Sequence, residues 1–80
     1  MSKEKLIREL ISRGYEEFAP EAAENFIDLF ESPEDALLYL KWMDLTPEKR
    51  EKFLKEEVPR AKNPELLRRR IMMSTPDVVP

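Results

Sequence analysis

Apolar residues recur along this chain three or four positions apart, in a series of short segments. This is the spacing of a helix with one buried side. No segment alternates apolar and polar residues as a half-buried strand does, and the sequence contains a single glycine, Gly14. The pattern predicts an all-α fold, a compact bundle of four to five short helices. We expect the helices at about residues 3–13, 20–31, 33–43, 47–57 and 64–73.

Prolines followed by an acid mark where these helices begin. Proline suits the first position of a helix, where a backbone N–H would have no partner in the helix. A Ser, Thr or Asn before the proline can accept a hydrogen bond from the first turn, and an acid after it lies against the positive end of the helix dipole. Three segments meet all of these conditions: Ser32-Pro33-Glu34, Thr46-Pro47-Glu48 and Asn63-Pro64-Glu65. We therefore interpret the repeated proline–acid pair as a helix start.

The third predicted helix, residues 33–43, is apolar around nearly its whole circumference. A helix of this kind belongs in the centre of a bundle. We expect the other helices to wrap around it, with its aromatic residues Tyr39 and Trp42 in the core. The alternative is that these two aromatic residues form an exposed binding platform, since aromatic residues are enriched at protein interfaces.

Length and composition limit the organisation of the chain. Eighty residues make one domain at most, and 39% of them are charged. We expect a single helical domain over residues 1–73 and a tail over 74–80 that is flexible or docked on a partner. Abundant Glu, Lys and Arg with few thermolabile residues is typical of a cytoplasmic protein from a thermophile.

The missing residue types argue against an enzyme. The chain has no cysteine and no histidine, and one glycine cannot build a phosphate-binding loop. We therefore expect no catalytic residue, no cofactor and no metal ligand. Charged residues interrupt the apolar positions near the N-terminus, so we expect no signal peptide. No apolar run approaches the roughly 18 residues that span a membrane, so we expect no membrane partner and a cytoplasmic location.

The second predicted helix has an acidic face that sets the charge balance of the chain. Residues 1–40 carry four bases and ten acids, whereas residues 41–80 carry ten bases and seven acids. Glu24, Asp28 and Glu31 lie opposite the apolar side of the helix at 20–31, where no lysine offsets their repulsion. We predict that these three acids bind a partner, with a plain solvated face as the alternative. Paired acids of this kind also resemble the Mg²⁺ ligands of an all-α nucleotide pyrophosphatase, but here no base accompanies them to hold a phosphate.

The segment "LLRRRIMM" in the fifth predicted helix is the second candidate surface. Three consecutive arginines cannot share one side of a helix, so Arg68 and Arg69 lie on the polar side and Arg70 lies within the apolar stripe. Arg70 either packs its stem on apolar neighbours or pairs with an acid at an interface. Met72 and Met73 are adaptable apolar groups of the kind found at protein-binding surfaces. We predict that these five residues contact a partner.

The segment from Leu10 to Leu40, "LISRGYEEFAPEAAENFIDLFESPEDALLYL", resembles the layout of a ubiquitin-associated-type three-helix domain. The shared features are a first helix, a Gly-aromatic turn at Gly14-Tyr15, a second helix and a third helix with the sequence "EDALLYL". In that family the Gly-aromatic turn and the third helix form a protein-binding patch. The resemblance therefore implies protein binding.

These observations favour a small, non-enzymatic interaction or regulatory module. We expect it to bind either another protein or a second copy of itself through helical surfaces of complementary charge. The alternative is a nucleic-acid-binding regulator that uses the basic C-terminal half of the chain.

Overall fold

The computed structural model describes residues 2–73, which fold into helices in the order that the sequence predicts. The elements are α1 (Ser2–Ser12), η1 (Glu16–Phe18), α2 (Ala19–Phe30), α3 (Pro33–Met43), α4 (Pro47–Glu56), η2 (Val58–Arg60) and α5 (Pro64–Met73), where η denotes a 3-10 helix. No strand occurs among the described residues, and each predicted helix boundary lies within one residue of the observed one. The all-α prediction is confirmed. The predicted tail at 74–80 lies outside the described residues, so the domain boundary stays a prediction.

The predicted caps are present at three helix starts. The side chains of Ser32, Thr46 and Asn63 each accept a hydrogen bond from the backbone N–H three residues further on, at 3.0, 3.4 and 3.3 Å. A proline follows each cap at the first helical position. The start of α2 differs, because Phe18 precedes it and supplies no side-chain hydrogen bond. The proline–acid pair is therefore part of the helix architecture.

Residues in left-handed backbone conformations turn the chain after α1 and after α2. Gly14 follows α1 with φ of 96°, a value that glycine adopts without steric cost. Glu31 follows α2 with φ of 62°, and its N–H donates to the carbonyl of Ile27 at 2.6 Å. A non-glycine residue in this conformation costs roughly 1–2 kcal/mol, which the tight turn into α3 must outweigh. Glu31 thus lies just beyond α2, whereas the sequence predicts it as the last helical residue.

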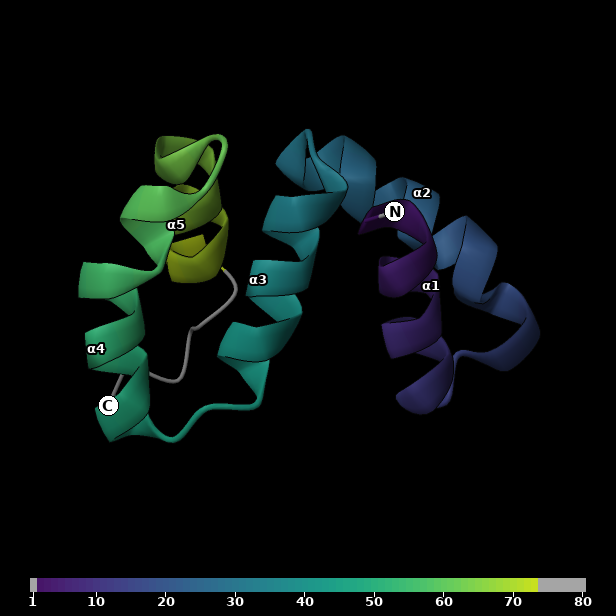
Figure 1. The fold of residues 1–80 in the computed structure, drawn as a ribbon, viewed down its shortest axis with the longest axis horizontal. Helices are drawn as coiled ribbons and strands as arrows, with labels where there is room; N and C mark the ends of the chain where they lie inside the picture. The colour runs from purple at the N-terminus through teal and green to yellow at the C-terminus, as the bar shows by residue number, and fades with distance from the viewer. Residues whose placement is uncertain (1, 74–80) are drawn as a thin grey trace.

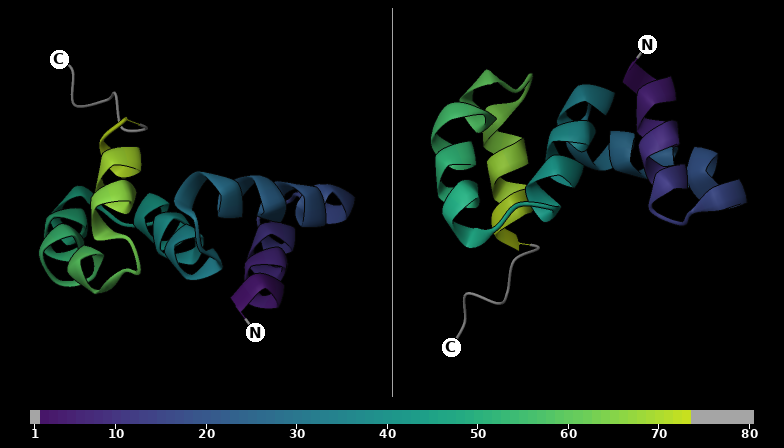
Figure 2. Two further views of the ribbon diagram at one scale, coloured as in Figure 1. Left: turned by 90° about the horizontal axis from the view of Figure 1, so that it is seen from above. Right: turned by 60° about the horizontal axis from the view of Figure 1, so that its bottom comes forward.

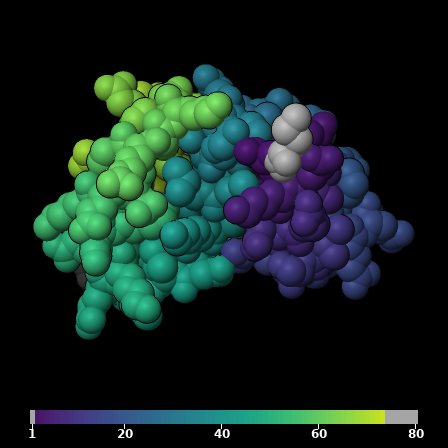
Figure 3. All heavy atoms as spheres, in the orientation of Figure 1, coloured from purple at the N-terminus to yellow at the C-terminus, as the bar shows by residue number. Residues whose placement is uncertain are grey.

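Helix α3 lies in the middle of the molecule, as predicted. Figure 1 shows α1 and α2 on one side of it and α4 and α5 on the other, and Figure 2 shows the same order from two further directions. In the space-filling view of Figure 3, α3 separates the surfaces of the two flanking pairs. The molecule measures 35 × 26 × 18 Å, so its thinnest dimension is less than two helix diameters. Helix α3 is therefore covered on two sides only: Ala36 and Leu40 are buried, whereas Met43 is 44% exposed.

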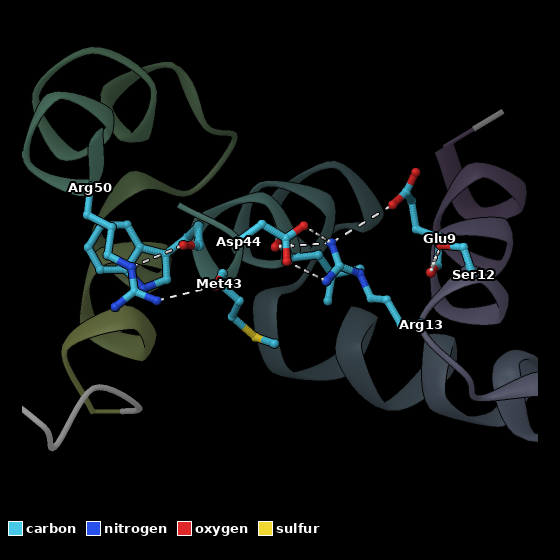
Figure 4. Close-up of polar contacts among 8 residues, drawn as sticks. Glu9, Ser12, Arg13, Met43, Asp44 and Arg50 are labelled. Carbon is cyan, nitrogen blue, oxygen red and sulfur yellow. Dashed lines mark hydrogen bonds and ion pairs between the residues drawn. The ribbon is translucent and has the colours of Figure 1, made fainter. Parts of the chain in front are cut away.

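Trp42 belongs to the core, which decides between the two sequence-based interpretations of this residue. It is 6% exposed, and its ring lies 6.0 Å from the ring of Phe53 in α4. The guanidinium of Arg50 lies 5.0 Å from the Trp42 ring centre and donates hydrogen bonds to the carbonyls of Trp42 and Met43, at 3.2 and 3.3 Å (Figure 4). Arg50 thereby satisfies carbonyls at the C-terminal end of α3 and attaches α4 to it.

A buried aspartate joins α3 to the start of α5. Asp35 is fully buried, and its two carboxylate oxygens each accept a hydrogen bond at 2.9 Å, from the backbone N–H groups of Lys62 and Asn63. Asn63 in turn caps α5. One carboxylate therefore fixes the loop that delivers α5 to the bundle. The sequence pattern does not single out this residue.

A second polar contact joins the C-terminal ends of α1 and α3. The guanidinium of Arg13 donates to both carboxylate oxygens of Asp44, at 2.8 and 2.6 Å, and to the carbonyl of Leu40 at 3.3 Å (Figure 4). The hydrogen bond from Arg13 and its positive charge hold the pKa of Asp44 below the ordinary value. The same hydrogen bond raises the pKa of Arg13.

Candidate protein-binding groove

The acidic residues predicted to bind a partner lie on the outer side of α2 or at its end. Glu24, Asp28 and Glu31 are all exposed. Glu24 forms an ion pair with Lys3 of α1, so the cation that offsets this face comes from a neighbouring helix that the sequence analysis did not consider. Within residues 2–73, no three acids are placed so that they could hold a metal ion. The role of these acids in partner binding stays a prediction.

The five residues predicted to bind a partner on α5 divide between different sides of that helix. Arg68, Arg69, Met72 and Met73 are exposed, and Met73 has 68% of its surface open. Arg70 is half-buried. Leu67 and Ile71 lie between these positions and hold α5 in the core. Only Arg70 and Met73 of the five line a hollow shared with other helices.

That hollow is an apolar groove between α2, α3 and α5. It has a volume of about 220 Å³. Its lining consists of Phe26, Leu29 and Phe30 from α2, Tyr39 from α3, and Arg70 and Met73 from α5. We call this set the α2–α5 groove.

The floor of the α2–α5 groove is a cluster of three aromatic rings. The ring centres of Phe30 and Tyr39 lie 4.9 Å apart, and the ring of Phe26 lies 6.4 Å from Phe30 and 6.2 Å from Tyr39. These separations fall within the range of attractive aromatic pairs. The rings therefore support one another and hold the groove in shape without a ligand. Leu29 and Met73, which are 42% and 68% exposed, form its rim.

A second apolar hollow continues the groove along α2. It has a volume of about 190 Å³ and is lined by Tyr15, Ala22, Asn25, Phe26 and Leu29. Phe26 and Leu29 line both hollows, so these two side chains form a ridge between them. The open apolar surface therefore extends from the loop after α1 to the end of α5.

Arg70 lies in the wall of the α2–α5 groove without a hydrogen-bond partner for part of its guanidinium. Its Nε is buried and makes no hydrogen bond within the described residues. The Nε of Arg13 is in the same condition, but the remaining nitrogens of Arg13 bind Asp44. Leaving a buried donor without an acceptor costs about 1–3 kcal/mol. The groove thus contains a cation whose hydrogen-bonding capacity residues 2–73 do not use fully.

Two larger hollows beside α3 are lined mostly by charged residues, and so is a third, of about 240 Å³, beside α4. Of the two beside α3, one, of about 330 Å³, contains the Arg13–Asp44 pair, and the other, of about 390 Å³, contains Glu34. Glu34 accepts a hydrogen bond from the Ser2 hydroxyl at 2.8 Å, which lowers the pKa of this carboxyl, and it also lies near Lys62. The charges of Arg13, Asp44 and Glu34 in these hollows are therefore engaged within the protein. The α2–α5 groove differs from these hollows because Arg70 is the one charged residue among the described residues that line it.

Comparisons with known proteins supply no relative: no protein-family model, no curated protein and no solved structure matches the chain. The resemblance to ubiquitin-associated-type domains therefore stays a prediction about layout. No helix in the described part of the chain is long and apolar enough to cross a membrane.

Two residues of the α2–α5 groove, Arg70 and Met73, were predicted from the sequence to contact a partner. Tyr39 was expected in the core, with an exposed binding platform as the alternative, and the three residues of α2 were not singled out. The available signal was the width of the apolar stripe on α2, which covers roughly 160° of the helix. A stripe this wide exceeds what one face against the bundle needs, and Leu29 at its edge is exposed. Which edge stays open depends on how α5 packs, and this is not visible in the sequence.

Proposed function

We propose that this protein is a small, non-enzymatic interaction module that binds a protein partner in the α2–α5 groove. The observation that carries the proposal is the pair of contiguous apolar hollows, with a rigid aromatic floor and exposed leucine and methionine side chains at the rim. Concave apolar sites with few polar groups are typical of binding sites. Met73 adds an unbranched side chain that adapts to different partner surfaces.

The energetic argument concerns Leu29 and Met73. Fully burying a leucine or methionine side chain contributes about 1.5–3 kcal/mol. Leu29 is 42% exposed and Met73 is 68% exposed, so covering both contributes about 1.5–3 kcal/mol in total. The partly exposed aromatic floor adds to this. A micromolar affinity corresponds to about 8 kcal/mol of net binding free energy, so Leu29 and Met73 supply only part of what a partner needs and further contacts must supply the rest.

The test is a quantitative capture experiment with matched variants. The immobilised full chain is exposed to an extract of cells that produce it, and bound proteins are quantified by mass spectrometry. Leu29→Asp should remove the specific partner, whereas Ile11→Asp should retain it. Ile11 is a suitable control because it is 48% exposed, similar to Leu29, and lines neither hollow of the groove. Equal capture by both variants would contradict the proposal.

A second candidate function, nucleic-acid binding, rests on charge separation. Residues 47–73, from α4 to α5, carry nine bases and five acids, and they form one end of the molecule (Figure 1). The exposed Arg68 and Arg69 are the first candidates for phosphate contacts. If they act in this way, affinity for DNA or RNA falls steeply with salt, and Arg68→Gln with Arg69→Gln lowers the slope by about 2. An unchanged slope rejects this candidate.

A further inference from the structure

We infer that the occupant of the α2–α5 groove is an amphipathic helix of another protein that carries a carboxylate beside its apolar stripe. This inference rests on the proposed function and specifies the partner. Three features carry it: the course of the open apolar surface along α2, the ridge that divides it, and Arg70 in its wall.

The shape of the surface favours a helical occupant. The apolar residues of α2 that line it without being buried are Ala22, Phe26 and Leu29, which have the i, i+4, i+7 spacing of one helix edge. The Phe26–Leu29 ridge has a hollow on each side, which is the relief that a packed helix matches with its own ridges and grooves. A helix also satisfies its own backbone N–H and C=O groups, so it can lie in an apolar groove that offers few backbone partners.

The position of Arg70 favours a carboxylate on that helix. Among the described residues, Arg70 is the one charged side chain that lines either hollow, and no acid accompanies it there. A partner without an acid would cover this cation and leave its charge uncompensated, which opposes binding. A carboxylate can instead form two parallel hydrogen bonds with the guanidinium fork. A small rotation of the Arg70 side chain would add the buried Nε, which now has no partner, to that fork.

Among residues 2–73, no acid lines the groove beside Arg70. Glu24, Asp28 and Glu31 do not line the groove, and Glu24 is already paired with Lys3. The excess of bases on the α4–α5 side adds long-range attraction for an acidic segment. Charge complementarity therefore points to an acid supplied by a separate partner, with this chain as the basic component of the contact.

The experiment is a selection of 16-residue peptides from a displayed random library against the immobilised full chain. Peptides that also bind the Leu29→Asp variant are removed, so that those retained depend on the groove. We expect them to show apolar residues at helical spacing together with an enriched Glu or Asp. Selection against Arg70→Gln should keep the apolar pattern and lose the acid. Arg8→Gln makes the same charge change at an exposed site that lines neither hollow and should keep the acid.

The best selected peptide then allows a double-mutant cycle, measured by fluorescence anisotropy. Arg70→Gln and the replacement of the peptide's acid by its amide should each weaken binding roughly 10- to 100-fold. The two changes together should weaken it little further, because each removes the same contact. Circular dichroism of the bound peptide should show helix.

Four results would overturn the inference. One is a set of groove-dependent peptides with no acid enrichment or without helical spacing. Another is an additive double-mutant cycle. A third is self-association of the full chain that Leu29→Asp abolishes, which would make a second copy the occupant. The last is tighter peptide binding by a Val78→Ser, Val79→Ser variant, which would make this chain's own C-terminal residues the occupant. A selection that yields no groove-dependent peptide contradicts the proposed function itself.

Discussion

Replacing Asp35 should destabilise the protein more than any other single exchange of an acid. Asp35 is fully buried and accepts two hydrogen bonds at 2.9 Å from backbone N–H groups. A hydrogen bond to a charged group contributes about 1.5–3 kcal/mol, and buried donors left without an acceptor add to the loss. We expect Asp35→Ala to cost about 3–5 kcal/mol and Asp35→Asn, which keeps one acceptor oxygen, about 2–3 kcal/mol. The free energy of unfolding of a domain of this length is about 4–12 kcal/mol in total, so the alanine variant should be near unfolding.

Urea unfolding followed by circular dichroism and by Trp42 fluorescence measures this loss. Asp28→Asn is the matched control, since it makes the same chemical change at an exposed site and should shift stability by less than about 0.5 kcal/mol. Hydrogen exchange in Asp35→Asn should accelerate more in α5 than in α1, because Asp35 fixes the loop that precedes α5. A loss below about 1 kcal/mol for Asp35→Ala, or uniform acceleration of exchange, would refute the reasoning.

Two further predictions concern the ends of α3. The pKa of Asp44 is depressed in the folded state, so its contact with Arg13 stabilises the fold at pH values above the ordinary carboxyl pKa of 3.8. This contribution is lost as the pH falls through the folded-state pKa. NMR titration should show a pKa for Asp44 below 3.8 that returns to 3.8 in Arg13→Gln, and an unshifted pKa in the parent protein would contradict this. Arg50→Met should lower the free energy of unfolding by about 1–2 kcal/mol, because it removes the contact with the Trp42 ring and the hydrogen bonds to two carbonyls. An unchanged midpoint of urea unfolding would show that the packing of α4 does not depend on this contact.

The helices were predictable because their signals are local. Each cap–proline–acid segment specifies a start within four residues, and the structure confirms the caps at Ser32, Thr46 and Asn63. The central position of α3 followed from its apolar circumference. The contact of Asp35 with the loop before α5 was not predictable, because its partners are backbone N–H groups 27 and 28 residues away and carry no side-chain signature.

The candidate site was predictable in part, for a related reason. Arg70 stood out because an arginine interrupts an apolar stripe, and this anomaly is visible in the sequence alone. Tyr39 was weighed as part of an exposed binding platform, although its place in the core was preferred. Phe26 and Leu29 did not stand out, since an aromatic or aliphatic residue on a helix stripe has the same appearance whether a neighbouring helix covers it fully or leaves one edge open. The packing of α5 beside α2 decides that outcome, and it leaves Leu29 exposed.

The most direct test of the central claim is photo-crosslinking at the groove inside cells that produce the protein. Leu29 is replaced by a photoreactive phenylalanine analogue, with the same replacement at Ile11 as the control, and adducts are identified by mass spectrometry. The account predicts a protein adduct that is specific to position 29 and that maps to an acidic amphipathic helix of the partner. Equal adducts at both positions, or adducts to nucleic acid alone, would contradict it.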